Sequence, residues 1–356
     1  MKTRNRYAMV FLISLSILVI GISNASIMFD EWAYVSAARN FIAGTPSVNP
    51  QHPPLAKYFI ALSIKTFGDY PFGWRFPSAV AGALLALSIF GLTFRLTGNL
   101  HTSYVAWLLI LANGFWFVMG RVAMLSIFEL AFEAAGVWAF VVAVRREEKE
   151  KNLRWLACSG ALFGLSIGCR WCGMVGLAVC LAYGLFHYRP FVKSAAVMTG
   201  TAISVYAASW VPLLVREHRT IHYLPMANAF IYQFHRHAEG DPRLGEMWWS
   251  WIFRFQPQPA LADLVGNPVV GVLGLAAVVV LLWQKKPLLP ALYIAHVLQW
   301  AIGVKPLTFY YYYFEAFTWL TVALAVALQG VEIRRVRLDV VTAAGAAAVF
   351  VHSYLM

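Results

Sequence analysis

The chain has 356 residues, of which 60% are apolar and only 12% are charged, about half the charged share (~25%) of an average soluble protein. This composition excludes a disordered chain and argues against a soluble domain of any class. Apolar runs long enough to cross a bilayer recur along the whole length, so the sequence predicts an all-α, polytopic membrane protein with one domain over residues 1–356.

Eleven apolar segments are predicted to be transmembrane helices, and the fifth and sixth are short enough to form one broken pair. In chain order they cover about 7–27, 76–95, 102–119, 122–144, 155–169, 172–187, 194–215, 267–283, 288–304, 309–329 and 339–355. No internal repeat or linker indicates a second domain.

The formal net charge is +12, and the positions of the charges predict the orientation. With the N-terminus in the cytoplasm, the cytoplasmic segments hold sixteen of the 28 lysines and arginines but only five acidic residues, as the positive-inside rule requires. The excess charge is therefore a topology signal, and we expect no nucleic-acid partner. The basic start resembles a signal peptide without a convincing cleavage site, so we expect an uncleaved first helix.

Two long loops then lie on the outer face, loop A (28–75) and loop B (216–266), and we expect the chemistry there because the cytoplasmic loops are short and basic. The four cysteines fall between 158 and 180, and we expect thiols without a redox role. Their spacing to histidines does not suit zinc.

Loop A opens with Asp30-Glu31, directly after the first span. Two adjacent carboxylates at the membrane surface are either a solvated helix end or a general base that takes a proton from an acceptor hydroxyl. His52 and Lys57 follow in HPPLAK, whose prolines suit the first turn of a helix. The stretch 54–67 is too short to span and is predicted to lie in the membrane interface.

Arginines stand at the outer ends of several spans, where the positive-inside rule makes them unexpected. Arg75, Arg121 and Arg170 either reach toward lipid phosphates or form a binding site for a phosphate or diphosphate group. Glu129 and Glu133 fall within the fourth segment, where we expect them to face the bundle interior and pair with a cation.

Loop B and the entry to the tenth segment carry the remaining polar candidates. His235 stands before a tryptophan-rich stretch that is predicted first as an interfacial anchor and second as a sugar-stacking surface. Lys305 precedes four consecutive tyrosines, 310–313, of which one or two, with Tyr310 first, are expected to bind substrate. Carboxylates, cations and aromatic residues on one face suit transfer from a lipid-linked phosphate leaving group.

At this point the chain resembles the protein O-mannosyltransferase family of membrane-embedded C-type glycosyltransferases (GT-C fold). The resemblance runs from about 25 to 330 and rests on FDEWAYVSAARNFIAG, HPPLAK, GWRFPSAVAGAL, GRVAML, LSIGCRWCG, the FH of loop B and the tyrosine-rich entry, in this order. The related aminoarabinose transferases share the carboxylate motif but fit HPPLAK less well.

The resemblance implies inverting transfer of mannose from a polyprenyl-phosphate-mannose donor to Ser or Thr hydroxyls of a protein acceptor, without a metal or cofactor. It implies that Asp30 is the base and Glu31 its neighbour in the acceptor site. It further implies that Arg75 and Arg121 lie near the donor phosphate or hold the first loop, and that His52 and His235 line the site. Substrate contacts are also expected from Lys57, Lys305 and Tyr310.

Three positions depart from the family pattern, namely Pro50, Ser126 and Lys305. They leave the sugar and the acceptor class open and suggest a bacterial or archaeal enzyme in the plasma (inner) membrane. The alternatives are a C-type transferase that moves another sugar to a lipid or glycan, and a non-enzymatic transporter or flippase. Transporters favour charges at the bilayer midplane and inverted repeats, whereas this chain places most of its non-cytoplasmic charge in outer loops.

Overall fold

The computed structural model describes residues 3–24, 29–46, 48–145, 149–188, 191–237, 246–255, 264–302, 308–333 and 336–354. Helices account for nearly all regular structure in these ranges, which confirms the predicted all-α class. The two strands, β1 (Glu332–Ile333) and β2 (Val336–Arg337), form a short antiparallel pair.

The first half of the chain forms a long interior bundle with two helices inserted in loop A. Its helices are α1 (Thr3–Val19), α2 (Phe29–Ala43), α3 (Leu55–Phe67), α4 (Pro71–Thr97), α5 (Leu100–Leu111), α6 (Gly114–Met119) and α7 (Leu125–Val144), with a 3₁₀ turn, η1 (Ile22–Asn24), after α1. The predicted interfacial helix of loop A corresponds to α3, and Pro54 stands immediately before it.

The second half adds a layer of antiparallel helices and a C-terminal group. Its elements are α8 (Lys149–Cys169), α9 (Gly173–His187), α10 (Val192–Ser209), α11 (Val211–Arg216), α12 (Tyr223–Arg236), η2 (Ser250–Phe253), α13 (Pro268–Trp283), α14 (Leu288–Leu298), η4 (Tyr310–Tyr313), α15 (Phe314–Ala327) and α16 (Leu338–Tyr354). Within the described residues, each of the eleven apolar segments falls on one helix or on two consecutive elements.

Three helical stretches are long and apolar enough to cross a membrane, 71–97, 125–144 and 192–216. Five shorter apolar helices accompany them in the described part of the chain. The number of membrane crossings and the orientation therefore stay predictions.

Small residues allow the helices to pack closely. Gly160 and Gly164 of α8 lie against the backbone of α10, where an added Cβ would come within 2.2 Å of the Met198 carbonyl oxygen and 2.5 Å of the Ala202 carbonyl oxygen. The i, i+4 spacing places both glycines on one face of α8, as in small-xxx-small contacts between membrane helices. Replacing either glycine by a larger residue would separate the two helices.

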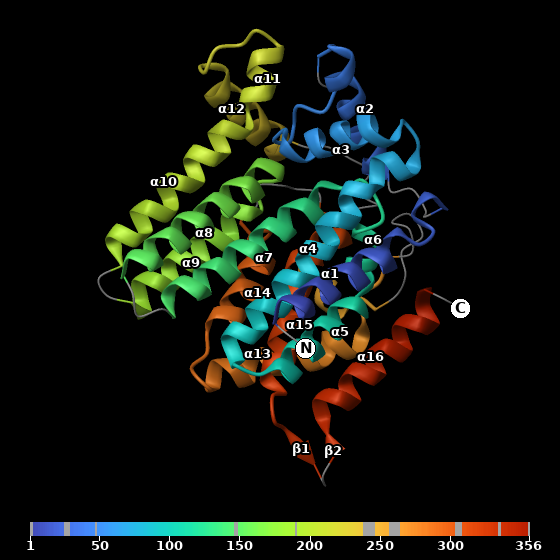
Figure 1. The fold of residues 1–356 in the computed structure, drawn as a ribbon, viewed down its shortest axis with the longest axis vertical. Helices are drawn as coiled ribbons and strands as arrows, with labels where there is room; N and C mark the ends of the chain where they lie inside the picture. Colours follow the sequence, from blue (N-terminus) through green and yellow to red (C-terminus); the bar gives the residue numbers. More distant parts are fainter. Residues whose placement is uncertain are drawn as a thin grey trace.

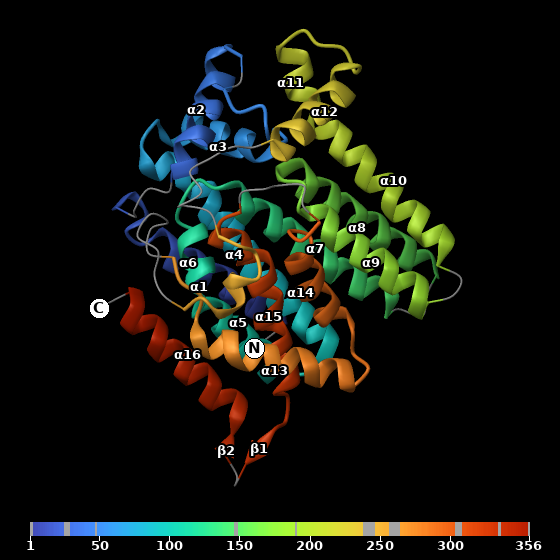
Figure 2. The same ribbon diagram turned by 180° about the vertical axis from the view of Figure 1, so that it is seen from behind.

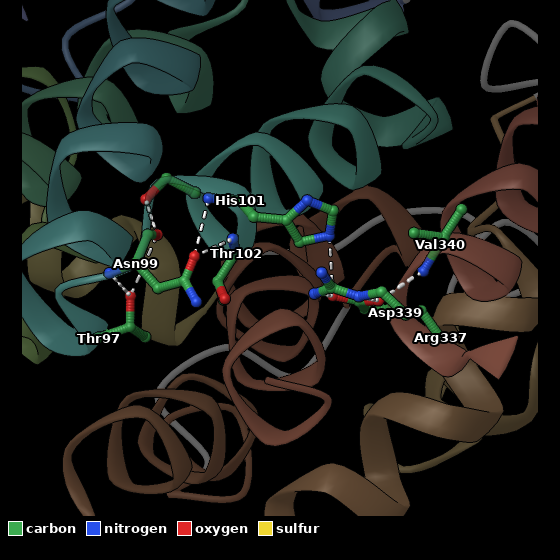
Figure 3. Close-up of polar contacts among 8 residues, drawn as sticks. Thr97, Asn99, His101, Thr102, Arg337, Asp339 and Val340 are labelled. Atoms are coloured by element: carbon green, nitrogen blue, oxygen red, sulfur yellow. Dashed lines mark hydrogen bonds and ion pairs between the residues drawn. The ribbon is translucent and has the colours of Figure 1, made fainter. Parts of the chain in front are cut away.

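The two ends of the molecule differ in character. Helices α2, α3, α11 and α12 gather at one end, and the β1–β2 pair lies at the other (Figure 1; the reverse view in Figure 2). At the β1–β2 end, the buried Asp339 accepts from Arg337 Nη2 at 2.8 Å and lies 3.0 Å from His101 Nε2, which fastens the start of α16 to α5 (Figure 3). Asn99 caps α5 in the same region, because its side chain accepts from the backbone of His101 and Thr102.

Candidate active site

The adjacent carboxylates Asp30 and Glu31 occupy different environments. Glu31 accepts from Arg75 Nε and Nη2, both at 2.7 Å, and from the backbone N–H of Ala123 at 2.8 Å. Arg75 Nη1 in turn donates to the Ile22 carbonyl at 2.9 Å, and both side chains are almost fully buried. This clamp joins α2 to α4, to the turn before α7 and to η1, so Glu31 and Arg75 have a structural task.

Asp30 is half-buried at the start of α2 and lies among tyrosines. Tyr311 donates its hydroxyl to Asp30 Oδ2 at 2.5 Å. Burial raises the pKa of Tyr34 well above its usual value, and the Asp30 charge adds to the rise. Tyr34 therefore stays a neutral hydroxyl beside the carboxylate.

A cavity of about 250 Å³ lies between loop A, the α8–α9 junction, α12 and the end of α14. Its polar lining includes His52, Arg170, His235 and Gln299, and its aromatic lining includes Trp300. The rings of His52 and His235 lie 4.9 Å apart, although loop A and loop B are distant in the sequence. We refer to this space as the His52–His235 cavity.

Arg170 provides the cationic wall of this cavity. It forms a buried ion pair through Nη1 with Glu315 of α15. Its guanidinium also lies over the rings of Tyr312, at 4.9 Å, and Trp300, at 5.7 Å. These contacts hold the Arg170 guanidinium at the cavity surface, where its remaining N–H groups suit an anionic group.

Asp30 is connected to the cavity by two short series of aromatic contacts. On one side, Tyr311 packs against Tyr312, with ring centroids 4.5 Å apart, and Tyr312 packs against Arg170. On the other side, Tyr34 of α2 meets His52 edge-on at 5.9 Å. Tyr311, Tyr312 and Tyr34 therefore lie between Asp30 and the residues that line the cationic cavity.

Lys57 lines a second cavity of about 360 Å³, between α2, α3 and α10–α12. Its ammonium donates to the Asn49 carbonyl at 2.5 Å and the His52 carbonyl at 2.9 Å. Burial lowers the pKa of Lys57 to about 7. Lys57 therefore supports the loop that carries His52, and His52 lines both cavities.

Three further sequence candidates lie elsewhere or outside the described residues. Arg121 donates to the Ile20 carbonyl at 2.5 Å and covers the end of α1, which agrees with holding the first loop rather than with a phosphate contact. The hydroxyl of Tyr310 donates to the Arg254 carbonyl and accepts from the backbone N–H of Gly266. Its neighbour Tyr311 is the tyrosine of this run that donates to Asp30. Lys305 lies outside the residues that the structure describes.

The acidic residues within α7 face the bundle interior, as expected, but only one of them finds a basic partner in the described part of the chain. Glu133 accepts from His296 at 2.8 Å and from Trp319 at 2.9 Å. Both carboxyl oxygens of Glu129 are buried without a hydrogen-bond partner among the described residues.

All four cysteines are free thiols, and Cys158 alone of them is exposed. The described residues contain no group of three or more metal-ligating side chains.

Comparison with known proteins extends this picture. The sequence model of the family described as dolichyl-phosphate-mannose–protein mannosyltransferase matches residues 51–212. A polyprenol-phosphate-mannose–protein mannosyltransferase of Corynebacterium glutamicum is 30% identical over 186 residues, which are 42% of this chain and 35% of that protein. The Mycobacterium tuberculosis protein of the same name is 30% identical over 122 residues, 34% of this chain and 23% of that protein. The chain thus spans about a third or less of the length of these relatives.

Among solved structures, ArnT from Cupriavidus metallidurans aligns with a TM-score of 0.68 and 16% identity, over 93% of this chain and 61% of ArnT. An Archaeoglobus fulgidus oligosaccharyltransferase aligns with a TM-score of 0.59 and 17% identity, over 98% of this chain and 51% of that one. The Saccharomyces cerevisiae Pmt1–Pmt2 complex bound to the sugar donor gives a TM-score of 0.53 and 20% identity, over 61% of this chain and 34% of that one.

These alignments show that the chain shares its fold, the GT-C fold, with these proteins. Within that fold, residues 51–212 are similar to the dolichyl-phosphate-mannose–protein mannosyltransferase family. The predicted family resemblance is confirmed. The matched segment contains His52, Lys57, Arg75, Arg121 and Arg170, whereas Asp30 precedes it.

Proposed function

We propose that the protein transfers mannose, with inversion, from a polyprenyl-phosphate-mannose donor to Ser or Thr hydroxyls of a protein acceptor. The family match and the names of the curated relatives support the donor and the acceptor class. We place the reaction on the outer face of the plasma membrane with the N-terminus in the cytoplasm, because the basic residues concentrate in the opposite set of loops.

One observation carries this proposal. Of two adjacent carboxylates, Glu31 is fully occupied by Arg75 and Ala123, whereas Asp30 is only half-buried and lies one tyrosine away from His52, which lines a cavity with a cationic wall. A carboxylate that is to take a proton must be reachable by the acceptor hydroxyl. Asp30 is therefore the base, and Glu31 positions the helix that carries it.

The reaction balances without a cofactor. Asp30 takes the proton of the acceptor hydroxyl, the oxygen bonds to the anomeric carbon of mannose, and the bond between that carbon and the phosphate oxygen breaks. The bonding electrons leave with the lipid phosphate, whose negative charge increases. Arg170 stabilises this charge from the cavity wall, and His52 and His235 supply hydrogen-bond donors.

The two cavities suit the two substrates. The His52–His235 cavity, with Arg170, is assigned to the donor phosphate and sugar. The larger cavity beside Lys57 is assigned to the acceptor, because it is lined by aromatic rings such as Trp210 and Tyr223 and by the charged residues Arg216 and Glu217. His52 forms the shared boundary of the two cavities, and Tyr34 links it to Asp30.

The test is transfer of label from polyprenyl-phosphate-mannose in membranes that contain the protein. We expect label on a Ser/Thr-rich peptide and none on a peptide in which Ala and Val replace these residues. Label on lipid or glycan instead would assign the protein to the transfer of sugars to non-protein acceptors. Movement of the intact donor across the membrane without transfer would indicate a flippase and contradict the proposal.

A further inference from the structure

Behind the cationic wall of the donor cavity lies a carboxylate for which the reaction has no direct use. Glu315, in the first turn of α15, is fully buried and pairs through Oε1 with Nη1 of Arg170. Its second oxygen, Oε2, has no hydrogen-bond partner within the described ranges. Arg170 lines the His52–His235 cavity and Glu315 does not, so the carboxylate stands behind the guanidinium as seen from the cavity.

This arrangement gives the cavity wall an unusual charge balance. A buried guanidinium with a buried counter-ion carries little net charge, although its remaining N–H groups can still donate to a phosphate. An anion in the cavity is attracted by Arg170 and repelled by Glu315, and both interactions are strong because the surroundings are apolar. Each additional negative charge on the anion strengthens both interactions, and Glu315 reduces the gain in attraction that Arg170 alone would give.

The two lipids of the proposed reaction differ in this property. The donor is a phosphodiester with one negative charge. The product carrier is a phosphomonoester, whose charge at pH 7 lies between −1.5 and −2, roughly, because the second pKa of such groups is about 6. The charge of Glu315 therefore shifts the preference of the site away from the spent carrier and toward the donor.

We propose that Glu315 sets this preference, so that the cavity binds the phosphodiester donor and releases the phosphomonoester product. The inference rests on the proposed function. Glu315 does not touch the lipid in this account, and it acts through Arg170 as a tuning residue. Without its charge, the spent carrier would stay bound to Arg170 and inhibit the next turnover.

The experiment measures the dissociation constants of polyprenyl phosphate and polyprenyl-phosphate-mannose for the purified full chain in lipid nanodiscs. We expect Glu315→Gln, which keeps an acceptor for Arg170 but removes the charge, to tighten binding of the monoester about tenfold more than binding of the diester. Glu315→Asp keeps the charge and should keep the wild-type ratio. The same Gln variant should show stronger product inhibition by polyprenyl phosphate and a lower kcat.

Glu133→Gln is the matched control, since it neutralises another buried acid whose partners are His296 and Trp319 rather than Arg170. In this variant, the ratio of the dissociation constants of polyprenyl phosphate and polyprenyl-phosphate-mannose should equal that of the wild type. Equal weakening of both lipids in Glu315→Gln would reduce Glu315 to a structural support and overturn the inference, as would an unchanged ratio. If Glu315→Gln does not fold, a shift toward the monoester in Glu315→Asp overturns it equally. Wild-type protein that binds neither lipid would refute the proposed function itself.

Discussion

Two buried arginine–glutamate pairs of this protein use the same chemistry in different ways. In the Glu31–Arg75 pair, both carboxylate oxygens and all three guanidinium nitrogens have partners, and no cavity of the site touches it. In the Arg170–Glu315 pair, one carboxylate oxygen lacks a partner in the described structure, and the arginine borders a cavity. The first pair holds helices together, because all of its polar atoms have partners within the protein. The second pair can also bind an anion, because its arginine borders a cavity.

The largest effect is expected at the Glu31–Arg75 pair. Arg75→Met removes the positive charge, the two parallel N–H···O bonds to Glu31 and the bond to Ile22. Breaking a buried pair costs ~3–5 kcal/mol, which is comparable with the whole stability of many domains. We expect a strong loss of folded protein, measured by size-exclusion chromatography and thermal unfolding in detergent.

The control for this prediction is Arg39, which also makes a two-point contact with an acid. Arg39 and Asp69 are 37% and 47% exposed, so solvent screens the pair and its loss costs only ~0–1 kcal/mol. Arg39→Met should therefore fold normally. Equal stability of the Arg75 and Arg39 variants would contradict the structural role of the Glu31–Arg75 clamp.

An intermediate effect is expected at the pair that borders the cavity. Arg170→Lys keeps the positive charge but loses the planar guanidinium that lies over Tyr312 and Trp300 and can bind phosphate through two N–H groups. We expect the KM for the donor to rise about tenfold, equivalent to ~1.4 kcal/mol, while the KM for the peptide acceptor stays near its wild-type value. Initial rates at varied donor concentration test this, and an unchanged donor KM would remove Arg170 from the phosphate site.

The smallest effect concerns the support of His52 by Lys57. Burial lowers the pKa of Lys57 to about 7, whereas a lysine in the unfolded chain titrates near ~10.4. Between these values the unfolded state binds a proton that the folded state does not, so this group makes stability rise with pH from 7 toward 10. Lys57→Met should lack this contribution. The measurement is the difference in unfolding temperature between the two proteins at pH 7 and pH 9, and parallel pH dependence would contradict the assignment.

Much of the helical architecture could be predicted from the sequence, because each apolar segment forms a helix in a bundle of this composition. The helix α12 in loop B was not expected. Its signal was present in Tyr223, Ala227 and Ile231, which recur every four residues and form its more buried side. The polar residues 235–237 at the end of this helix interrupt its apolar periodicity.

The site was predictable in composition but not in detail. The DE pair could be recognised from the sequence, but the choice between Asp30 and Glu31 depends on Arg75, 44 residues away. Tyr310 and Tyr311 are indistinguishable in a run of four tyrosines, and neighbours on a 3₁₀ helix point about a third of a turn apart. Glu315 was missed, although an acid within an apolar segment is itself a signal of function.

The central claim is that Asp30 is the base and Glu31 is structural, and it is tested most directly by transfer from labelled polyprenyl-phosphate-mannose to peptide. Asp30→Asn keeps the shape of the side chain and removes its basicity. At equal amounts of folded protein, we predict that Asp30→Asn lowers the transfer rate by at least ~100-fold with an unfolding temperature close to that of the wild type. Transfer at a rate similar to that of the wild type would contradict the account.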